Sequence, residues 1–167
     1  MTIEAIVMRL DAALERFEAA PVSKESVDQR SAIARLLHSA EVEGYRLGLV
    51  TALPAERLHA VLEEQFGAAC LDYFSAVVSG DQPFSNGTRL HPYDVALRTL
   101  GVPCECAVAC ASSEPERSEA ERFGIPTCVH LEDMSYTVTA SRPTRRLAWF
   151  ARDSKAALAP MNARCGA

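Results

Sequence analysis

With 167 residues, of which 49% are hydrophobic and 23% charged, the chain is long enough to bury the core of one domain. Its net charge of −5 argues against a general nucleic-acid binder, because such proteins carry a basic excess. No apolar run approaches the roughly 20 residues that cross a bilayer, and the first segment carries Glu4 where a secretory signal would be apolar. We therefore expect a cytoplasmic protein that binds neither nucleic acid nor membrane.

The six cysteines are spread through the chain, and several lie in apolar runs, at positions 70, 104, 106, 110, 128 and 165. Such thiols are typical of buried, unpaired cysteines in a reducing compartment. The three between 104 and 110 lack the paired C-x-x-C spacing of a structural zinc site. We expect free thiols and no metal bound by cysteine.

Strand-like and helix-like segments alternate along the chain. Apolar runs bounded by turn residues predict strands at 3–8, 45–50, 74–78, 106–110 and 126–131. Helical spacing of apolar residues, with Gly and Pro at the ends, predicts helices at 11–19, 26–40, 54–66, 92–100, 114–123 and 145–158. The segment 79–90 is rich in turn residues, and 159–167 has the character of a loose tail.

This alternation is typical of an α/β fold with a Rossmann-like three-layer architecture. We expect a central parallel sheet of five strands with helices on both faces. Ligand sites in such folds lie beyond the carboxyl ends of the strands, where the strand order reverses. The residues of interest are therefore those that follow Met8, Val50, Val78 and Cys110.

The first strand and the loop after it carry a known motif in altered form. The run Ile-Glu-Ala-Ile-Val-Met-Arg-Leu-Asp-Ala-Ala-Leu at 3–14 resembles the opening of the haloacid dehalogenase (HAD) superfamily. In that family a hydrophobic strand leads into Asp-x-Asp-Gly-Thr-Leu, and the first Asp attacks phosphorus. Here the attacking position holds Arg9, and Asp11 matches the second acid. A protonated guanidinium has no lone pair to offer and cannot be that nucleophile.

Further landmarks of the family follow in the expected order. The run 47–52 is similar to the second motif, and Thr51 matches the residue that hydrogen-bonds the phosphoryl group. The run 77–81 resembles the third strand and its turn, and 89–102 resembles the Lys-Pro segment with its helix. By this alignment, Arg89 stands where the phosphate-neutralising Lys would be.

The fourth motif is the most altered. The family has Glu-Asp-Ser or Asp-Asp-Ser after the fourth strand, and the acids hold Mg²⁺. The corresponding residues here are Ala111, Ser112 and Ser113. Mg²⁺ requires oxygen ligands, and Asp11 is the one expected acid that remains. The resemblance therefore implies a metal-independent pseudoenzyme with the HAD fold. Such a protein would have no Mg²⁺ cofactor and would form no aspartyl-phosphate intermediate.

The remaining charges allow two arrangements of the old pocket. In the first, Arg9 pairs with Asp11 and the salt bridge plugs the site. In the second, Arg9 takes the place of the metal in an anion site, because its planar fork matches phosphate or carboxylate oxygens. The candidate ligand-binding residues are Arg9, Asp11, Thr51, Arg89, Ser112 and Ser113. Either arrangement favours a binding or regulatory protein.

An enzyme of another reaction class is the alternative. Asp11, His91, Cys110 and Ser112 are candidates for a nucleophilic triad near the strand ends. Each also has a structural interpretation: Cys110 ends a buried strand, Ser112 caps the helix that begins near 114, and His91 caps the helix at Pro92. A residual HAD-type phosphatase is the third hypothesis.

The domain organisation bears on what could cover the site. We expect a HAD-like core at 1–140 with a rudimentary helical insert at about 14–43, too short for a full cap, and a helix and tail at 141–167. The site would be open unless a protein partner or a second copy of the chain covers it. The charged run 114–122 is expected to be a solvated helix face. Leu147, Trp149 and Phe150 form an apolar patch expected to pack on the sheet or contact a partner.

Overall fold

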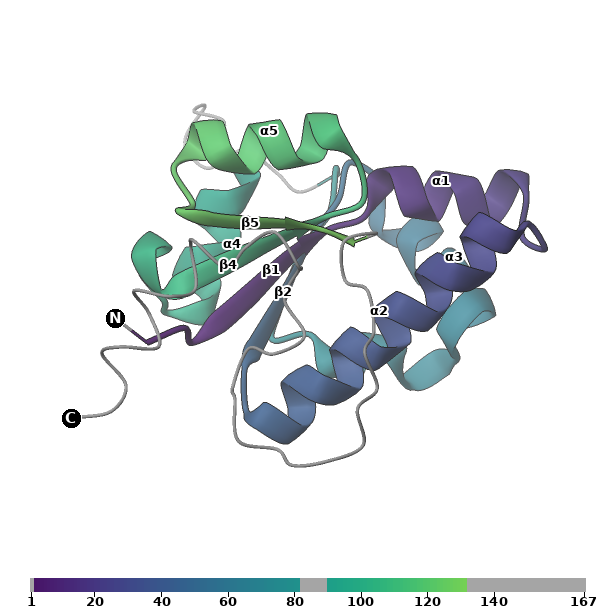
Figure 1. Cartoon of the computed structure of the whole chain (residues 1–167), viewed down its shortest axis with the longest axis horizontal. Coiled ribbons are helices and arrows are strands. Elements are labelled where there is room, and N and C mark those ends of the chain that lie inside the picture. The colour runs from purple at the N-terminus through teal and green to yellow at the C-terminus, as the bar shows by residue number, and fades with distance from the viewer. Residues whose placement is uncertain (1, 82–89, 132–167) are drawn as a thin grey trace.

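The computed structural model describes residues 2–81 and 90–131. Its centre is a parallel sheet of five strands in the order β3-β2-β1-β4-β5 (Figure 1). The strands are β1 (Ala5–Arg9), β2 (Arg46–Val50), β3 (Ala76–Val78), β4 (Ala107–Ala111) and β5 (Thr127–His130). Because β2 and β4 flank β1 on opposite sides, the strand order reverses at the carboxyl end of β1.

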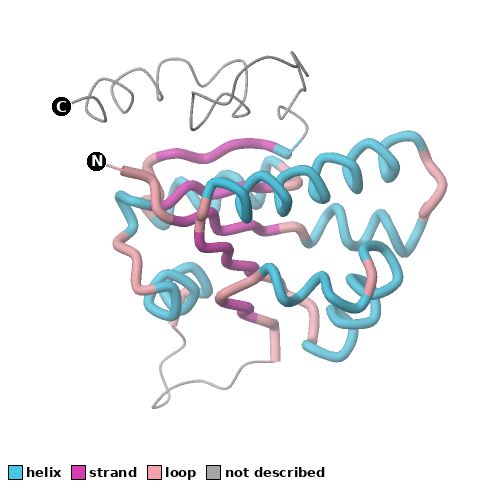
Figure 2. The backbone as a smooth tube through the Cα atoms, turned by 90° about the horizontal axis from the view of Figure 1, so that it is seen from below, coloured by secondary structure: helices cyan, strands magenta, loops and turns pink. Residues whose placement is uncertain are grey.

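The helices between the strands cover both faces of the sheet. They are α1 (Asp11–Ala19), α2 (Lys24–Glu43), α3 (Ala55–Phe66), α4 (Pro92–Leu100) and α5 (Glu114–Phe123), with the 3₁₀ helices η1 (Ala68–Tyr73) and η2 (Cys104–Cys106). In Figure 1, α5 lies above the strands and α2 below them. Figure 2 shows the strands in magenta enclosed by helices in cyan. The predicted three-layer α/β fold with a five-stranded parallel sheet is therefore confirmed.

The strands are buried on both faces because their residues alternate between two cores. Ile6 and Met8 of β1 pack in one core with the buried faces of α1, α2 and α3. Ala5 and Val7 pack in the other core with α4 and α5. Strands covered on both faces read as continuous apolar runs, which is the pattern that predicted them. The helices of the predicted insert, α1 and α2, pack on the sheet itself.

The observed element boundaries follow local signals. Ser23 caps α2 by accepting a hydrogen bond from the Ser26 N–H, and Gly101, with a φ of 66°, ends α4. The predicted helices 11–19, 92–100 and 114–123 agree with α1, α4 and α5 to the residue. The predicted strand 74–78 shortens to Ala76–Val78. Phe74 is the C-cap of η1, which the sequence did not indicate, and its N–H donates to the carbonyl oxygen of Leu71 instead of joining the sheet.

Part of the predicted organisation lies outside the described residues. This applies to the helix at 145–158, the tail, most of the loop at 79–90 and Arg89. The division into 1–140 and 141–167 therefore stays a prediction. Among the described residues, no helix combines the length and apolar character required to span a membrane.

Candidate functional site

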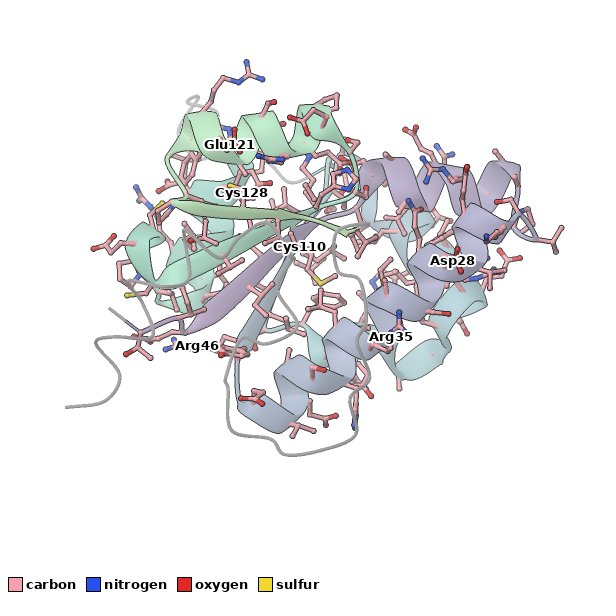
Figure 3. All side chains as sticks on the ribbon, viewed as in Figure 1. Asp28, Arg35, Arg46, Cys110, Glu121 and Cys128 are labelled. Atoms are coloured by element: carbon pink, nitrogen blue, oxygen red, sulfur yellow. The ribbon has the colours of Figure 1, made fainter. Side chains whose placement is uncertain are left out.

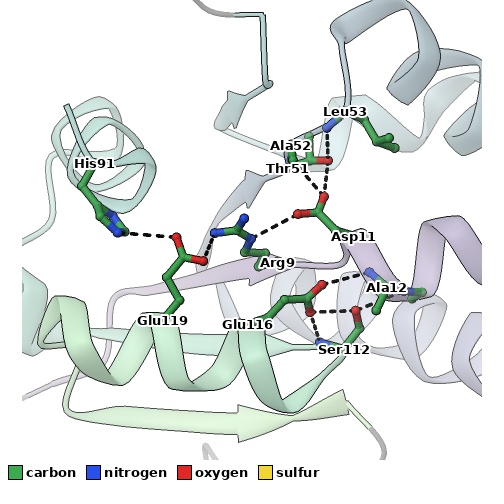
Figure 4. A network of polar contacts seen from close by, with 11 residues as sticks. Arg9, Asp11, Ala12, Thr51, Ala52, Leu53, His91, Ser112, Glu116 and Glu119 are labelled. Atoms are coloured by element: carbon green, nitrogen blue, oxygen red, sulfur yellow. Dashed lines mark hydrogen bonds and ion pairs between the residues drawn. The ribbon is translucent and has the colours of Figure 1, made fainter. Parts of the chain in front are cut away.

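Arg9 lies at the carboxyl end of β1 between two carboxylates. Its Nε donates to Oδ2 of Asp11 at 3.1 Å, and its Nη1 lies 2.5 Å from Oε2 of Glu119 on α5 (Figure 4). The side chain is 16% exposed. Burial alone would lower the pKa of the guanidinium, but the two carboxylates, Glu119 foremost, outweigh it and hold the pKa above its ordinary value. Arg9 is therefore a permanent cation with both partners in place.

Asp11 joins the loop after β1 to the loop after β2. Besides accepting from Arg9, its carboxylate accepts through Oδ1 from Oγ1 of Thr51 at 2.5 Å and from the Ala52 N–H at 3.0 Å. Oγ1 of Thr51 in turn accepts from the Leu53 N–H at 3.0 Å. Three of the residues expected at the site, Arg9, Asp11 and Thr51, are thus in one hydrogen-bonded chain.

The loop after β3 is held against the same place. The Gly80 N–H donates to the carbonyl oxygen of Leu53 at 2.8 Å. A Cβ at Gly80 would lie 2.0 Å from the carbonyl oxygen of Ala52, which no side chain could tolerate without displacing that loop. The close approach explains why glycine follows Ser79 at this turn.

A second carboxylate of α5 occupies the start of α1. Oε1 of Glu116 accepts from the Ala12 N–H at 2.9 Å, and its Oε2 accepts from the N–H and Oγ of Ser112 at 2.7 and 2.8 Å (Figure 4). Oγ of Ser112 also accepts from the Ala13 N–H at 3.1 Å. The first N–H groups of a helix have no partner within it and attract anions. Here Glu116 and Ser112 supply that partner from elsewhere in the fold.

The prediction that 114–122 is a solvated helix face was wrong for two of its residues. Glu116 is 6% exposed, and the Glu119 side chain is 32% exposed. Glu116 and Ala120 share a helical face with Phe123, at i, i+4 and i+7, and this face packs toward the sheet. That spacing was visible in the sequence, but the abundance of charge concealed it. Glu114 and Glu121 are exposed as expected.

His91 approaches the same cluster from α4. Its Nδ1 accepts from the Tyr93 N–H at 3.3 Å, which confirms the predicted capping role. Its Nε2 lies 3.5 Å from Oε1 of Glu119, and its ring stacks on Phe123 with centroids 4.7 Å apart. The hydroxyl of Tyr93 is buried and has no hydrogen-bond partner among the described residues. Burial raises the pKa of that hydroxyl.

The residues proposed for a triad are engaged separately. Cys110 is fully buried in β4 (Figure 3), and burial raises the pKa of its thiol to about 12. Ser112 bonds Glu116, and His91 faces Glu119. The N-cap of α5 is Ser113, whose side chain makes no capping hydrogen bond, so the prediction that Ser112 caps this helix was wrong. Arg89 lies outside the described residues. An enzyme of another class stays a prediction.

The side chains described at the strand ends do not offer the set of free oxygen ligands that Mg²⁺ prefers. Both oxygens of Asp11 are taken by Arg9, Thr51 and Ala52, and Ala111 has no side-chain donor. Within the described ranges, no group of three or more His, Cys, Asp or Glu residues could hold a metal ion. None of the five described cysteines forms a disulfide within the described ranges.

No protein-family model matches the sequence, and no curated protein matches it. Solved structures do. The structure of CbbY from Rhodobacter sphaeroides in complex with phosphate is 19% identical with a TM-score of 0.55, over 84% of this chain and 90% of that one. A CbbY variant in complex with xylulose-(1,5)bisphosphate has a TM-score of 0.54 at 19% identity, over 77% and 86%. The structure of a predicted phosphoglycolate phosphatase from Haemophilus somnus is 13% identical with a TM-score of 0.51, over 78% and 84%.

The chain therefore shares the fold of the CbbY structures and of the predicted phosphoglycolate phosphatase, which agrees with the fold expected from the motifs. At such low identities the likeness concerns the fold and leaves the activity open. The first of the CbbY structures is a complex with phosphate.

Proposed function

We propose that this protein is a HAD-like domain without Mg²⁺-dependent phosphatase activity, acting as a binding or regulatory protein in the cytoplasm. The observation that carries the proposal is the guanidinium of Arg9 between Asp11 and Glu119. In the motif, this position holds the carboxylate that attacks phosphorus. An internal ion cluster therefore replaces both the nucleophile and the site that would bind a metal ion next to phosphate.

The charges around Arg9 support a plugged site more strongly than an anion site. One guanidinium is shared by two carboxylates, and Glu116, a third, takes N–H groups of the first turn of α1. The cluster of these four groups is net negative, so it repels a phosphate. The N–H and hydroxyl groups that would donate to phosphate oxygens already donate to side chains of the same protein.

The proposal is tested by titrating Mg²⁺ into the protein by calorimetry and by assaying a generic phosphate ester with and without Mg²⁺. We expect no saturable heat and no hydrolysis above the blank. Saturable Mg²⁺ binding together with Mg²⁺-dependent turnover that Asp11→Asn abolishes would overturn it.

A matched variant pair shows which residue is responsible. Arg9→Asp with Ser112→Asp returns acids to two motif positions and should give a measurable heat of Mg²⁺ binding. Arg57→Asp makes the same change of charge as Arg9→Asp at an exposed ion pair with Glu18, on α3 and outside the motif runs, and should bind no Mg²⁺. Equal heats from both would show that added acid, and not its position, governs binding.

A metal-free anion site is the second candidate, and the partial exposure of Glu119 favours it. Glu119 and His91 have side chains that are 32% and 37% exposed. An anion from solvent could therefore replace the Glu119 carboxylate as a partner of Arg9. Glu119→Gln would then strengthen binding of inorganic phosphate through Arg9, because one competing charge is removed. Phosphate binding is measured by calorimetry, and Arg9→Gln in the same background should abolish it.

A further inference from the structure

A groove lies between α2 and η1, away from the cluster around Arg9. A cavity of about 410 Å³ is lined by Glu41, Tyr45, Leu47, Ala69, Asp72 and Tyr73. A smaller one of about 120 Å³, lined by Ala34, Leu37, Phe66, Cys70 and Tyr73, adjoins it. Tyr73 lines both cavities, and the two together are here called the α2–η1 groove. Its larger part is in the size range of ligand pockets.

The chemistry of the α2–η1 groove suits a basic and aromatic segment. Its lining is partly apolar and partly polar. Tyr73 is 39% exposed, and the exposed residues Glu41 and Asp72 bring carboxylates to the larger cavity. A tyrosine face beside a carboxylate attracts a guanidinium both by stacking and by charge. The apolar part accepts a large side chain, since burial of an aromatic ring contributes strongly to docking.

The chain itself contains a segment of this chemistry. Residues 1–141 hold 21 of the 22 acids and 11 of the 17 bases, whereas residues 142–167 hold one acid and six bases. The main part of the chain is therefore strongly acidic and its end basic. The basic end also contains Leu147, Trp149 and Phe150 beside Arg145 and Arg146. This end of the chain lies outside the described residues.

The tether is long enough to reach the groove. The described chain stops at Leu131, just after β5, which is three strand positions from β2. Neighbouring strands are about 4.8 Å apart, and a strand of five residues is roughly 17 Å long. The ten residues from 132 to 141 can extend to about 33 Å, which exceeds the in-plane path from the end of β5 to Leu47 at the start of β2.

We propose that residues 142–158 dock in cis on the α2–η1 groove, with their arginines on Glu41 and Asp72 and their aromatic residues against Tyr45 and Tyr73. The groove is then an internal docking surface that a competing basic, aromatic peptide could occupy when the tail leaves. This inference concerns the face of α2 and does not depend on whether the Arg9 cluster is inactive.

Trp149 makes the proposal testable in the full-length protein, because it is the single tryptophan of the chain. Its emission maximum and its quenching by acrylamide are compared with those of the same protein unfolded in urea. We expect a shift to shorter wavelength and protection from the quencher in the native protein. Glu41→Lys with Asp72→Lys should move both readouts toward the unfolded values, with the far-UV circular dichroism unchanged.

Two further variants locate the effect. Arg145→Glu with Arg146→Glu, added to the double lysine variant, should restore protection, since the charges of groove and tail are exchanged. Glu105→Lys with Glu114→Lys makes the same charge change at exposed residues that precede β4 and begin α5, whose neighbours pack in the other core. This control should leave Trp149 protected.

Three results would overturn the proposal. Trp149 could be as accessible in the native protein as in urea. Its protection could be unaffected by the groove variants, which would place it elsewhere, for example on the sheet as first expected. Protection that increases with protein concentration would mean that a second copy supplies the segment.

Discussion

At the residue scale, one replacement is accompanied by a set of new contacts. A guanidinium at the end of β1 leaves most of its surface out of water, and an unpaired charge there would be costly. Asp11 supplies one partner from the next turn, and Glu119 supplies the other from α5. Glu116, one turn earlier on α5, closes the start of α1. The end of β1 is therefore joined to α5 by the ion pair of Arg9 with Glu119 and by the hydrogen bonds of Glu116.

Glu116 should be the most sensitive position of this cluster. Glu116→Ala leaves the Ala12 N–H and the Ser112 hydroxyl without their acceptor, whereas the Ser112 N–H keeps the carbonyl oxygen of Arg9. Each buried donor so deprived costs on the order of 1–3 kcal/mol. We expect the free energy of unfolding to fall by roughly 2–4 kcal/mol, measured by urea denaturation.

Glu121→Ala on the same helix is the control. Glu121 lies on the outer surface of α5 (Figure 3) and forms a solvent-exposed ion pair with Arg117 at 2.9 Å. Its replacement should therefore lower the free energy of unfolding by less than about 0.5 kcal/mol. Equal losses for the two variants would mean that the Glu116 contacts do not stabilise the fold.

At the element scale, the helices begin in three different ways. The start of α2 is capped by its own Ser23 and that of α4 by the ring of His91. The start of α1 is capped by Ser112, from the turn after β4, and by Glu116 of α5. Ser113 occupies the N-cap of α5 without a capping hydrogen bond. The same residue type thus has different energetic weight at two helix starts.

Ser23→Ala and Ser113→Ala therefore form a matched pair. Ser23→Ala removes the acceptor of the Ser26 N–H and should lower the free energy of unfolding by about 1 kcal/mol. Ser113→Ala removes no capping bond and should cost clearly less. Thermal and urea denaturation of both proteins provide the comparison, and a larger loss at Ser113 would contradict it.

At the scale of the whole molecule, the core between the sheet and α1, α2 and α3 contains two buried thiols, Cys70 and Cys110. Burial raises the pKa of Cys110 to about 12 and that of Cys70 to about 11, from an ordinary value near 9. Above that ordinary value the unfolded chain releases these protons while the folded chain retains them. The unfolded state then binds fewer protons, so stability falls as pH rises.

We expect the free energy of unfolding to decline from about pH 9 toward pH 11, with Cys110 contributing about 1 kcal/mol by pH 10. Cys110→Ala should make the decline shallower, in urea denaturation at pH 8 and pH 10 with a reductant. Val108→Ala, on the same strand and in the same core, opens a cavity without removing a thiol. It should lower stability at both pH values and leave the slope as in the unaltered protein.

Much of the fold could be predicted because its signals are local. Gly101, Gly124 and Pro92 mark helix ends within one turn of the residues they affect. The apolar runs of β1, β2 and β4 indicate strands covered on both faces. The strand ends, and with them Arg9, Asp11 and Thr51, could therefore be placed at one edge of a parallel sheet.

The partners of those residues could not be predicted in the same way. Ala12 and Glu116 are 104 positions apart and meet because β4 lies beside β1 and α5 follows β4. From the sequence alone, Arg9 could either form an internal salt bridge or bind an external anion. Which of the two forms depends on which carboxylates the fold brings close to Arg9. The amino-acid order determined that a cation replaces the acid at the end of β1, since that is a matter of residue identity. The tertiary structure decided that Glu119 and Glu116 surround the site, since packing of a distant helix sets where charges meet.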